Sequence, residues 1–334
     1  MIPPPTALVS KLRDVVVRDH APGVTVMVLR NGQLLYRVDV GDIDPSAQFP
    51  IASASKWVAA ALILSVVDEG KLALDEPVGQ RLPEFTGEAG MITLRQLLSF
   101  TSGQGGIRDL FDIRQDPHIT LAEAVVQIAA RPLEDQPGAV FKYGSPALQV
   151  AGRLAEQATG KPWAALFDER IGKPLGLKRT YWSGALRPDL DPATVRNPNL
   201  QGGLVTTADD YVRFLTMLAA GGVYEGRQIL SPAAVETLET AQTLNKPKAY
   251  LPPGAAGLGE YALGNWCEAV TSHGSCTIVS SAGALGTFPW IDRGSGVYGI
   301  FFMRYWFKAV AGDLRQARRI ILDNVPPKAV PRDP

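Results

Sequence analysis

The chain has 334 residues, 46% of them hydrophobic and 20% charged, and its 33 basic residues balance 33 acidic residues to a formal net charge of zero. A globular chain of this length exceeds the size at which a single core usually stops growing, so we expect two lobes. The balanced charge offers no basic surface for nucleic acid, and the longest apolar run, residues 57–67, is too short to span a bilayer, which argues against a nucleic-acid partner and a membrane span.

The first half of the chain predicts a hairpin and then a helical block. Two apolar runs within residues 22–41 flank Asn31-Gly32, a dipeptide that fits a type I′ turn. Helical signals dominate from Ser53 to about residue 176, with Gly70 ending the first helix. Thr93 and Gln96 form an expected capping box.

A later helix in this block has signals at both ends. Ser145 is the expected N-cap, Pro146 the first helical residue and Gly160 the C-terminal glycine. A further amphipathic helix is expected within residues 118–130.

The second half of the chain predicts mainly strands. After a polar, proline-rich stretch at 183–198 comes a helix capped by Thr207 and Asp210 and ended by Gly221. Strands then follow until a final helix over 311–325, whose apolar residues lie on one face. The tails, residues 2–5 and 326–334, are expected to be disordered.

This order of elements predicts an α+β fold. The simplest packing is an antiparallel sheet built from both chain ends, with the helical block inserted as a second lobe. We place the sheet lobe at residues 1–52 and 195–334 and the mainly helical lobe at 53–194, with the active site between them.

The compartment depends on the two cysteines and on the N-terminus. The first 20 residues lack the basic-then-apolar pattern of a signal peptide, which favours the cytoplasm if this is the full native chain. Cys267 and Cys276 lie in a strand–turn–strand segment, where a disulfide and two free buried thiols are equally compatible with the sequence. A disulfide, together with a removed leader, would indicate a periplasmic or secreted protein.

A lysine in the segment FPIASASKWVAAAL, residues 49–62, stands in the first turn of an apolar helix, where the helix dipole disfavours a cation. Ser53 and Lys56 are three residues apart, so the amine can reach the hydroxyl on one helix face. A lysine whose burial lowers its proton affinity can take the serine proton and create a nucleophile. Alone, S-x-x-K occurs by chance about once in such a chain, and the alternative is a solvated Lys56 with a capping Ser53.

Other common catalytic patterns are missing from the sequence. It contains no G-x-S-x-G, H-E-x-x-H, P-loop or complete Rossmann glycine fingerprint. Its three histidines, His20, His118 and His273, are not clustered, so we expect no metal and no cofactor.

The chain resembles the serine β-lactamase and penicillin-binding-protein superfamily, in the branch of class C β-lactamases, D-alanyl-D-alanine carboxypeptidases and β-lactamase-like carboxylesterases. The resemblance rests on segments that follow one another in the same order: residues 49–78, 92–103, 141–163, 172–182, 202–214, 261–266 and 281–292. It implies a β-lactamase/transpeptidase-like fold whose sheet is flanked by N- and C-terminal helices.

The resemblance also implies residue roles. Ser53 corresponds to the acylated nucleophile, Lys56 to its activating partner, and Tyr143 to the tyrosine of Y-x-N, a general base that a Lys56 ammonium would help to ionise. The backbone N–H groups of Ser53 and Ala284 would form the oxyanion hole. From sequence alone, Tyr143 is also compatible with an aromatic residue packed at a helix start.

Two departures from the family pattern concern substrate binding. Ser145 replaces the asparagine of Y-x-N, and Ser281, in the Ser281-Ala282-Gly283 motif, replaces a lysine or histidine that helps to bind a substrate carboxylate. With Gly283, these serines are the predicted substrate-binding residues. A hydroxyl cannot replace a charge-assisted bond in strength, so we expect a small-molecule acyl substrate, best a neutral ester or amide.

Several functions stay open at this point. Rival activities are a β-lactamase, a D-alanyl-D-alanine carboxypeptidase or an acyltransferase, and the non-enzyme rival is an idle binding module on the same fold. The aromatic residues Tyr181, Trp182, Trp266, Phe288 and Trp290 are candidates for an acyl pocket, although we expect most of them in the core. The oligomeric state is not determined by the sequence.

Overall fold

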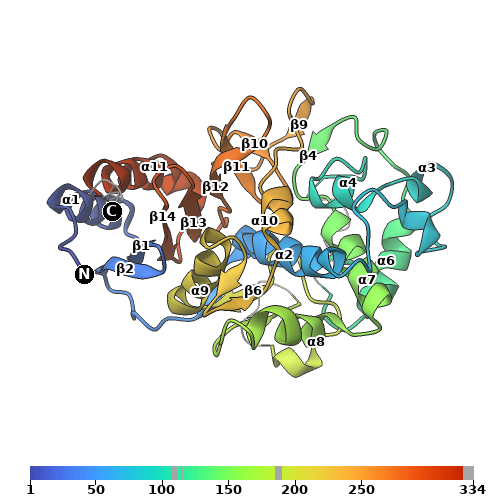
Figure 1. The fold of residues 1–334 in the computed structure, drawn as a ribbon, viewed down its shortest axis with the longest axis horizontal. Coiled ribbons are helices and arrows are strands. Elements are labelled where there is room, and N and C mark those ends of the chain that lie inside the picture. Colours follow the sequence, from blue (N-terminus) through green and yellow to red (C-terminus); the bar gives the residue numbers. More distant parts are fainter. Residues whose placement is uncertain (107–111, 114–115, 185–189, 326–334) are drawn as a thin grey trace, which may run out of the picture.

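The computed structural model describes residues 1–106, 112–113, 116–184 and 190–325. Its largest sheet has seven strands. In chain order they are β1 (Gly23–Arg30), β2 (Gln33–Gly41), β10 (Glu260–Tyr261), β11 (Trp266–Val270), β12 (Cys276–Ser280), β13 (Phe288–Asp292) and β14 (Val297–Met303). They lie in the order β10-β11-β12-β13-β14-β1-β2, and every neighbouring pair is antiparallel (Figure 1).

The sheet joins the two ends of the chain as predicted. Strand β14 pairs with β1 in a register that sets Val24 opposite Met303. Strands β1 and β2 form the expected hairpin, and both turn residues, Asn31 (φ 50°) and Gly32 (φ 76°), have the positive φ that a type I′ turn requires. The antiparallel α+β fold is therefore confirmed.

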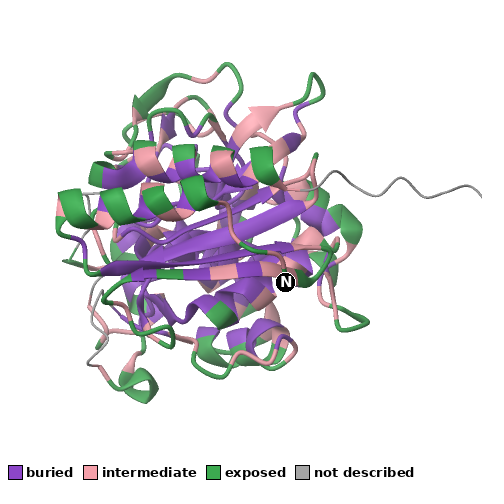
Figure 2. Ribbon diagram, turned by 90° about the vertical axis from the view of Figure 1, so that its left-hand side faces the viewer, coloured by how far each residue is buried: buried purple, intermediate pink, exposed green. Residues whose placement is uncertain are grey.

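Helices cover both faces of this sheet. Helix α1 (Thr6–Asp19) and helix α11 (Phe307–Asn324) pack together on one face, where Asp313 forms ion pairs with Lys11 and Arg18. Helix α9 (Ala208–Ala219) lies on the other face, against β13, β14 and β1. Figure 2 shows the exposed outer surfaces of the helices and the buried strands that they cover.

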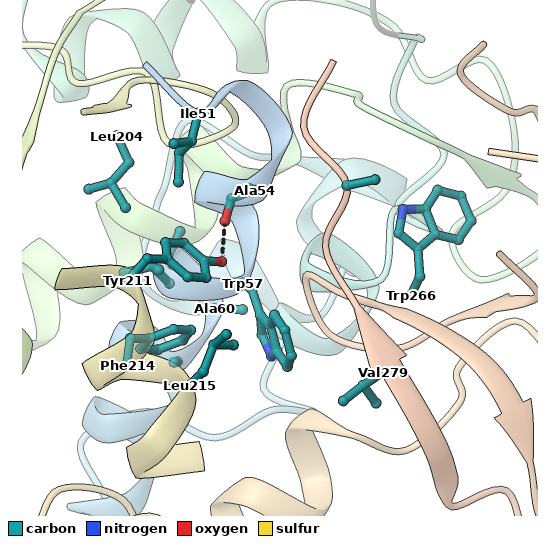
Figure 3. Packing of buried hydrophobic residues seen from close by; sticks show 14 of the residues in the cluster. Ile51, Ala54, Trp57, Ala60, Leu204, Tyr211, Phe214, Leu215, Trp266 and Val279 are labelled. Carbon is teal, nitrogen blue, oxygen red and sulfur yellow. Dashed lines mark hydrogen bonds between the residues drawn. The ribbon is translucent and has the colours of Figure 1, made fainter. Parts of the chain in front are cut away.

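Helix α2 (Ser55–Asp68) runs through the centre of the molecule. It is buried from its first residue to Val66, as expected of a helix that is apolar on nearly all sides. Figure 3 shows side chains of α9 packed against it: Phe214 lies edge-on to Trp57, and the Tyr211 hydroxyl donates a hydrogen bond to the Ala54 carbonyl at 2.8 Å. The start of α2 is thus fixed from the sheet side.

The remaining helices lie mainly on the other side of α2 (Figure 1). They are α3 (Gly87–Gly90), α4 (Leu94–Leu98), α6 (Leu121–Ala129), α7 (Ala147–Thr159), α8 (Trp163–Phe167) and α10 (Pro232–Leu238), the last of which packs on α2. Short 3₁₀ turns are η1 (Ala52–Ala54), η2 (Val78–Gln80) and η4 (Pro192–Thr194), and η3 (Asp168–Gly172) is π-helical. The lobe boundaries given above stay a prediction.

Small sheets connect the two sides. Their strands are β3 (Phe49–Pro50), β6 (Leu204–Thr206) and β5 (Tyr181–Trp182) in one, β4 (Phe141–Lys142) and β9 (Lys248–Tyr250) in a second, and β7 (Val223–Tyr224) and β8 (Arg227–Gln228) in a third.

Several local predictions are confirmed and others are corrected. The Thr93–Gln96 capping box forms, and the Thr207 side chain accepts a hydrogen bond from Asp210 N–H. Pro146, not Ser145, is the N-cap of α7, and no side chain caps this end. At the other end of α7, Gly160 does adopt the expected left-handed conformation.

The ends of the chain differ from the sequence prediction. The final helix begins at Phe307, four residues before the predicted start at 311. Ile2 N–H donates to the Leu35 carbonyl at 2.8 Å, so the N-terminal tail is attached to β2. The other tail, residues 326–334, lies outside the described residues.

A disulfide joins Cys267 and Cys276 across strands β11 and β12. Their Cα atoms are 5.2 Å apart, and nine positions separate them in the chain. The register is offset, since Cys267 faces Val279 and Cys276 faces Val270. Of the two states that the sequence left open, the structure contains the bonded one.

Removing this disulfide is expected to destabilise the protein by about 2–3 kcal/mol, the loop-entropy value for a short closed loop. The double variant Cys267→Ala/Cys276→Ala should unfold several degrees below the wild type in a thermal melt. Dithiothreitol should lower the wild-type midpoint toward that value and leave the variant unchanged. A wild-type midpoint indifferent to reductant, with both thiols free in non-reducing peptide mapping, would contradict this assignment.

Candidate active site

Ser53 lies in a strained turn between a strand and a helix. Ala52, just before it, has φ 47°, a left-handed conformation that is uncommon for a residue with a side chain. The turn is held because Ile51 N–H donates to the Leu204 carbonyl and Leu204 N–H donates to the Ser55 hydroxyl, both at 3.0 Å. Strand β6 therefore fixes both sides of Ser53.

Lys56 is buried, with only 2% of its surface exposed. Its Nζ lies 2.8 Å from the Ser53 Oγ and 2.8 Å from the backbone carbonyl oxygen of Gln201. The side chain does not extend to solvent, so the alternative of a solvated Lys56 does not hold. The first helical turn brings the amine and the hydroxyl into contact, as the spacing of three predicts.

Tyr143 follows β4 and completes the cluster. Its ring centroid is 4.8 Å from the Lys56 Nζ, and its ring stacks on Trp266 with centroids 5.3 Å apart. Phe100, Phe141 and Tyr261 also contact the ring.

This aromatic enclosure determines the protonation state of Tyr143. Burial raises the pKa of Tyr143 well above its ordinary value, a hydrogen bond with Ser53 acts in the opposite direction, and Tyr250 raises it further. Tyr143 is therefore a neutral phenol near pH 7 in the free protein. The loss of hydration on burial is the largest of these three effects, and the expectation that a Lys56 ammonium favours the ionised form of Tyr143 stays a prediction.

Ser53 and Ala284, the residues predicted to supply the oxyanion hole, both line one pocket. Within the described chain, neither Ser53 N–H nor Ala284 N–H donates a hydrogen bond, whereas Gly283 N–H donates to the Thr287 carbonyl at 2.7 Å. Free donors at this position are what an oxyanion hole requires. The segment after β12 can approach closely because Gly283 has no side chain: a Cβ there would lie 2.1 Å from the Ile51 carbonyl oxygen.

A pocket of about 260 Å³ opens in front of Ser53. Its wall is mainly apolar, and a cation, Lys308, stands among the lining residues. They are Ser53, Tyr143, Tyr250, Pro252, Pro253, Ala255, Leu258, Trp266, Ala282, Ala284, Trp306, Phe307 and Lys308. Such a size and composition suit a small, largely apolar substrate.

The predicted substrate-binding residues do not line this pocket. Ser281 is buried, and its hydroxyl donates to the Ser53 carbonyl at 3.3 Å. Ser145 is also buried, and its Oγ has no hydrogen-bond partner among the described residues. Gly283 lies behind the wall, which is formed by Ala282 and Ala284 instead. The role of these three residues in substrate binding stays a prediction.

Of the five aromatic candidates, Trp266 alone is among the residues that line the pocket. Trp182 packs on Trp163, and Phe288 and Trp290 belong to the core, as expected for most of them. Sequence reasoning missed Gln201, Tyr250, Trp306 and Lys308. A sequence does not show that the backbone carbonyl of Gln201 accepts a hydrogen bond from Lys56. Tyr250, Trp306 and Lys308 come from segments that only the fold brings close to Ser53.

The described part of the chain holds neither a candidate metal site nor a candidate membrane-spanning helix. Residues 1–106, 112–113, 116–184 and 190–325 hold no group of three or more histidine, cysteine, aspartate or glutamate side chains that could bind a metal ion. The described helices include none long and apolar enough to cross a membrane.

The antiparallel sheet with flanking helices, and the serine–lysine pair beside it, define a protein of the β-lactamase/transpeptidase-like fold. A family model described as Beta-lactamase matches residues 7–322, and the chain belongs to this family. The family consists of hydrolytic enzymes that act on small molecules, so the chain is a hydrolase of this family.

Individual relatives agree with this assignment. Protein Rv1367c of Mycobacterium tuberculosis is 30% identical over 349 residues, which cover 88% of this chain and 85% of the relative. Esterase EstB of Burkholderia gladioli is 36% identical over 183 residues, covering 47% and 46% of the two chains. A crystal structure from Bacteroides dorei superposes with a TM-score of 0.84 at 34% identity, covering 96% of this chain and 99% of that one.

Proposed function

We propose that the protein is a serine carboxylesterase that forms an acyl-enzyme at Ser53. The observation that carries the proposal is the contact of the buried Lys56 amine with the Ser53 hydroxyl at 2.8 Å, beside two backbone N–H groups that have no acceptor among the described residues. The name of the relative EstB supports an esterase rather than another hydrolase of the family.

In the acylation step, the neutral amine of Lys56 takes the hydroxyl proton as the Ser53 Oγ forms a bond to the ester carbonyl carbon. The carbonyl oxygen becomes an oxyanion, which the N–H groups of Ser53 and Ala284 stabilise. Tyr143 donates its phenolic proton to the leaving alkoxide and recovers a proton from the Lys56 ammonium. An alcohol leaves, and the acyl group stays on Ser53.

In the deacylation step, a water molecule attacks the acyl carbon and loses a proton to Lys56 through Tyr143. Collapse of the second tetrahedral intermediate breaks the Ser53 ester, and the Ser53 oxygen takes a proton back. An alcohol in place of water would give acyl transfer by the same route.

The apolar wall of the pocket favours neutral esters. The replacement of the family's lysine or histidine by Ser281 removes a cation next to the nucleophile, and the Ser281 hydroxyl is already bonded to the Ser53 carbonyl. A charge-assisted hydrogen bond contributes about 1.5–3 kcal/mol. Substrates that depend on such a bond should react less well than esters without a carboxylate.

We expect kcat/KM for p-nitrophenyl butyrate to exceed that for nitrocefin by at least about tenfold, which corresponds to the lower end of that energy range. Spectrophotometric assays of the two substrates on one enzyme preparation, with p-nitrophenyl butyrate hydrolysis by Ser53→Ala as the background, measure this ratio. A preference for nitrocefin would overturn the esterase proposal and leave the serine mechanism intact.

One observation favours a second candidate, a β-lactamase or D-alanyl-D-alanine carboxypeptidase. Lys308, at the start of α11, lines the pocket and forms no hydrogen bond or ion pair with the described residues. Its ammonium group is the cation that would pair with a substrate carboxylate in this pocket. In that case Lys308→Ala should lower kcat/KM for nitrocefin and leave p-nitrophenyl butyrate hydrolysis unchanged.

A further inference from the structure

Gln201 contacts two parts of the site that are far apart in the sequence. Its backbone carbonyl accepts a hydrogen bond from the Lys56 Nζ at 2.8 Å, and its side-chain Nε2 donates to the Ser145 carbonyl at 2.6 Å. Its own N–H donates to Asn199 Oδ1 at 3.2 Å. A single buried residue thus joins the helix of Lys56 to the turn that carries Tyr143.

The orientation of Gln201 is determined by its partners. The Ser145 carbonyl can only accept, so the side-chain nitrogen must face it. The side-chain oxygen, Oε1, is then buried without a hydrogen-bond partner in the described chain, and the same is true of the Ser145 Oγ. Two unpartnered polar atoms beside a catalytic lysine are costly and point to a role other than packing.

The contact with Lys56 restricts how its amine can point. A carbonyl oxygen accepts only a donor, so one N–H of Lys56 is held on Gln201. This contact also sets the directions of the other substituents on the Lys56 nitrogen, including the one that faces the Ser53 hydroxyl. Ser145 stands where the motif Y-x-N, which the chain resembles, has an amide side chain. The shorter Ser145 side chain makes no hydrogen bond with the described residues.

We propose that Gln201 is a positioning residue for Lys56, linking it to the Tyr143–Ser145 turn in place of the amide that Ser145 lacks. The inference rests on the proposed function, because it assumes that Lys56 activates Ser53. It predicts that the chemistry of the side chain at 201 controls how readily Ser53 reacts, and over which pH range.

Two substitutions separate positioning from simple packing. Gln201→Leu keeps the approximate shape and removes the hydrogen bond to Ser145. Gln201→Glu removes the donor and adds a negative charge within one side-chain length of Lys56. The titratable groups around Lys56 are the phenol of Tyr143 and, behind it, that of Tyr261, and burial raises the pKa of both above the ordinary value. A new carboxylate favours the ammonium form of Lys56, so a higher pH is needed to free the base.

The test measures the second-order rate constant for labelling of Ser53 by a fluorophosphonate, by intact mass as a function of pH. We expect Gln201→Leu to lower this rate constant by about 10- to 100-fold, as small misplacements of catalytic groups do. For Gln201→Glu we expect the acidic limb of the pH profile to move up by about one to two pH units. Gln127→Leu, which changes an exposed glutamine of α6, should match the wild type.

The outcomes distinguish this inference from the proposed function. A folded Gln201→Glu variant whose acidic limb coincides with that of the wild type, or a Gln201→Leu variant labelled as fast as Gln127→Leu, would overturn the inference. A lower thermal midpoint with an unchanged rate per active site would assign Gln201 a purely structural role. Failure of the wild type itself to be labelled at Ser53 would instead overturn the proposed function.

Discussion

Replacing Ser53 with alanine is expected to lower ester hydrolysis by about 10⁴- to 10⁶-fold, the range in which loss of a covalent nucleophile falls. The substitution removes the Oγ that lies 2.8 Å from the Lys56 Nζ and leaves the backbone N–H of residue 53 in place. The small remaining activity would come from the oxyanion hole and from substrate binding. Initial rates with p-nitrophenyl butyrate, corrected for spontaneous hydrolysis, measure the change.

Covalent labelling provides an independent readout. Intact mass after treatment with a fluorophosphonate should show one adduct on the wild type and none on Ser53→Ala. Ser65→Ala is the matched control, because Ser65 is a buried serine on α2, the helix that follows Ser53, and its hydroxyl bonds only to the Leu62 carbonyl and the Arg170 guanidinium. If the wild type formed no adduct, the idle binding module would become the better explanation of the fold.

Replacing Lys56 with methionine should affect activity and stability in opposite directions. Loss of the base that accepts the Ser53 proton should reduce kcat by about 10³- to 10⁴-fold, near the upper end for general-base catalysis. Methionine fills a similar volume without a polar amine, so the substitution relieves the cost of burying an ionisable group away from water. We therefore expect the thermal midpoint of Lys56→Met to equal or exceed that of the wild type.

The control for this variant is an exposed lysine. Lys71 forms a surface ion pair with Glu69 at 3.0 Å, and such pairs contribute little, so Lys71→Met should leave both kcat and the midpoint nearly unchanged. A Lys56→Met protein that hydrolyses esters at the wild-type rate would exclude Lys56 as the base. A large fall in its midpoint would show that the lysine supports the fold instead.

Local signals in the sequence were sufficient for many elements of the fold. Asn31-Gly32 defined the first hairpin, and Thr93 and Thr207 marked helix starts, because each effect depends on residues no more than a few positions apart. The prediction that Ser145 is an N-cap was wrong because it, too, used only local signals. Ser145 has the chemistry of an N-cap, but its turn is held from outside by Gln201, a residue 56 positions away.

The candidate site was predictable where the motifs were made of side chains. The cluster of Ser53, Lys56 and Tyr143 came from motif order, and the structure brings these residues together. The neutral state of the Tyr143 phenol was not predictable, because it depends on burial among rings from several separate segments. The contact between Gln201 and Lys56 was not predictable either, because Gln201 takes part in it only through its main-chain carbonyl.

The close approach of Gly283 to Ile51 limits which residues can stand behind the nucleophile. A Cβ at position 283 would lie 2.1 Å from the Ile51 carbonyl oxygen, so any residue other than glycine would push this segment away from the turn that carries Ser53. The bond from the Ser281 hydroxyl to the Ser53 carbonyl comes from the same segment and would be lost with it. Trp306 and Lys308 line the pocket without taking part in this contact, so exchanges there would change the pocket wall alone.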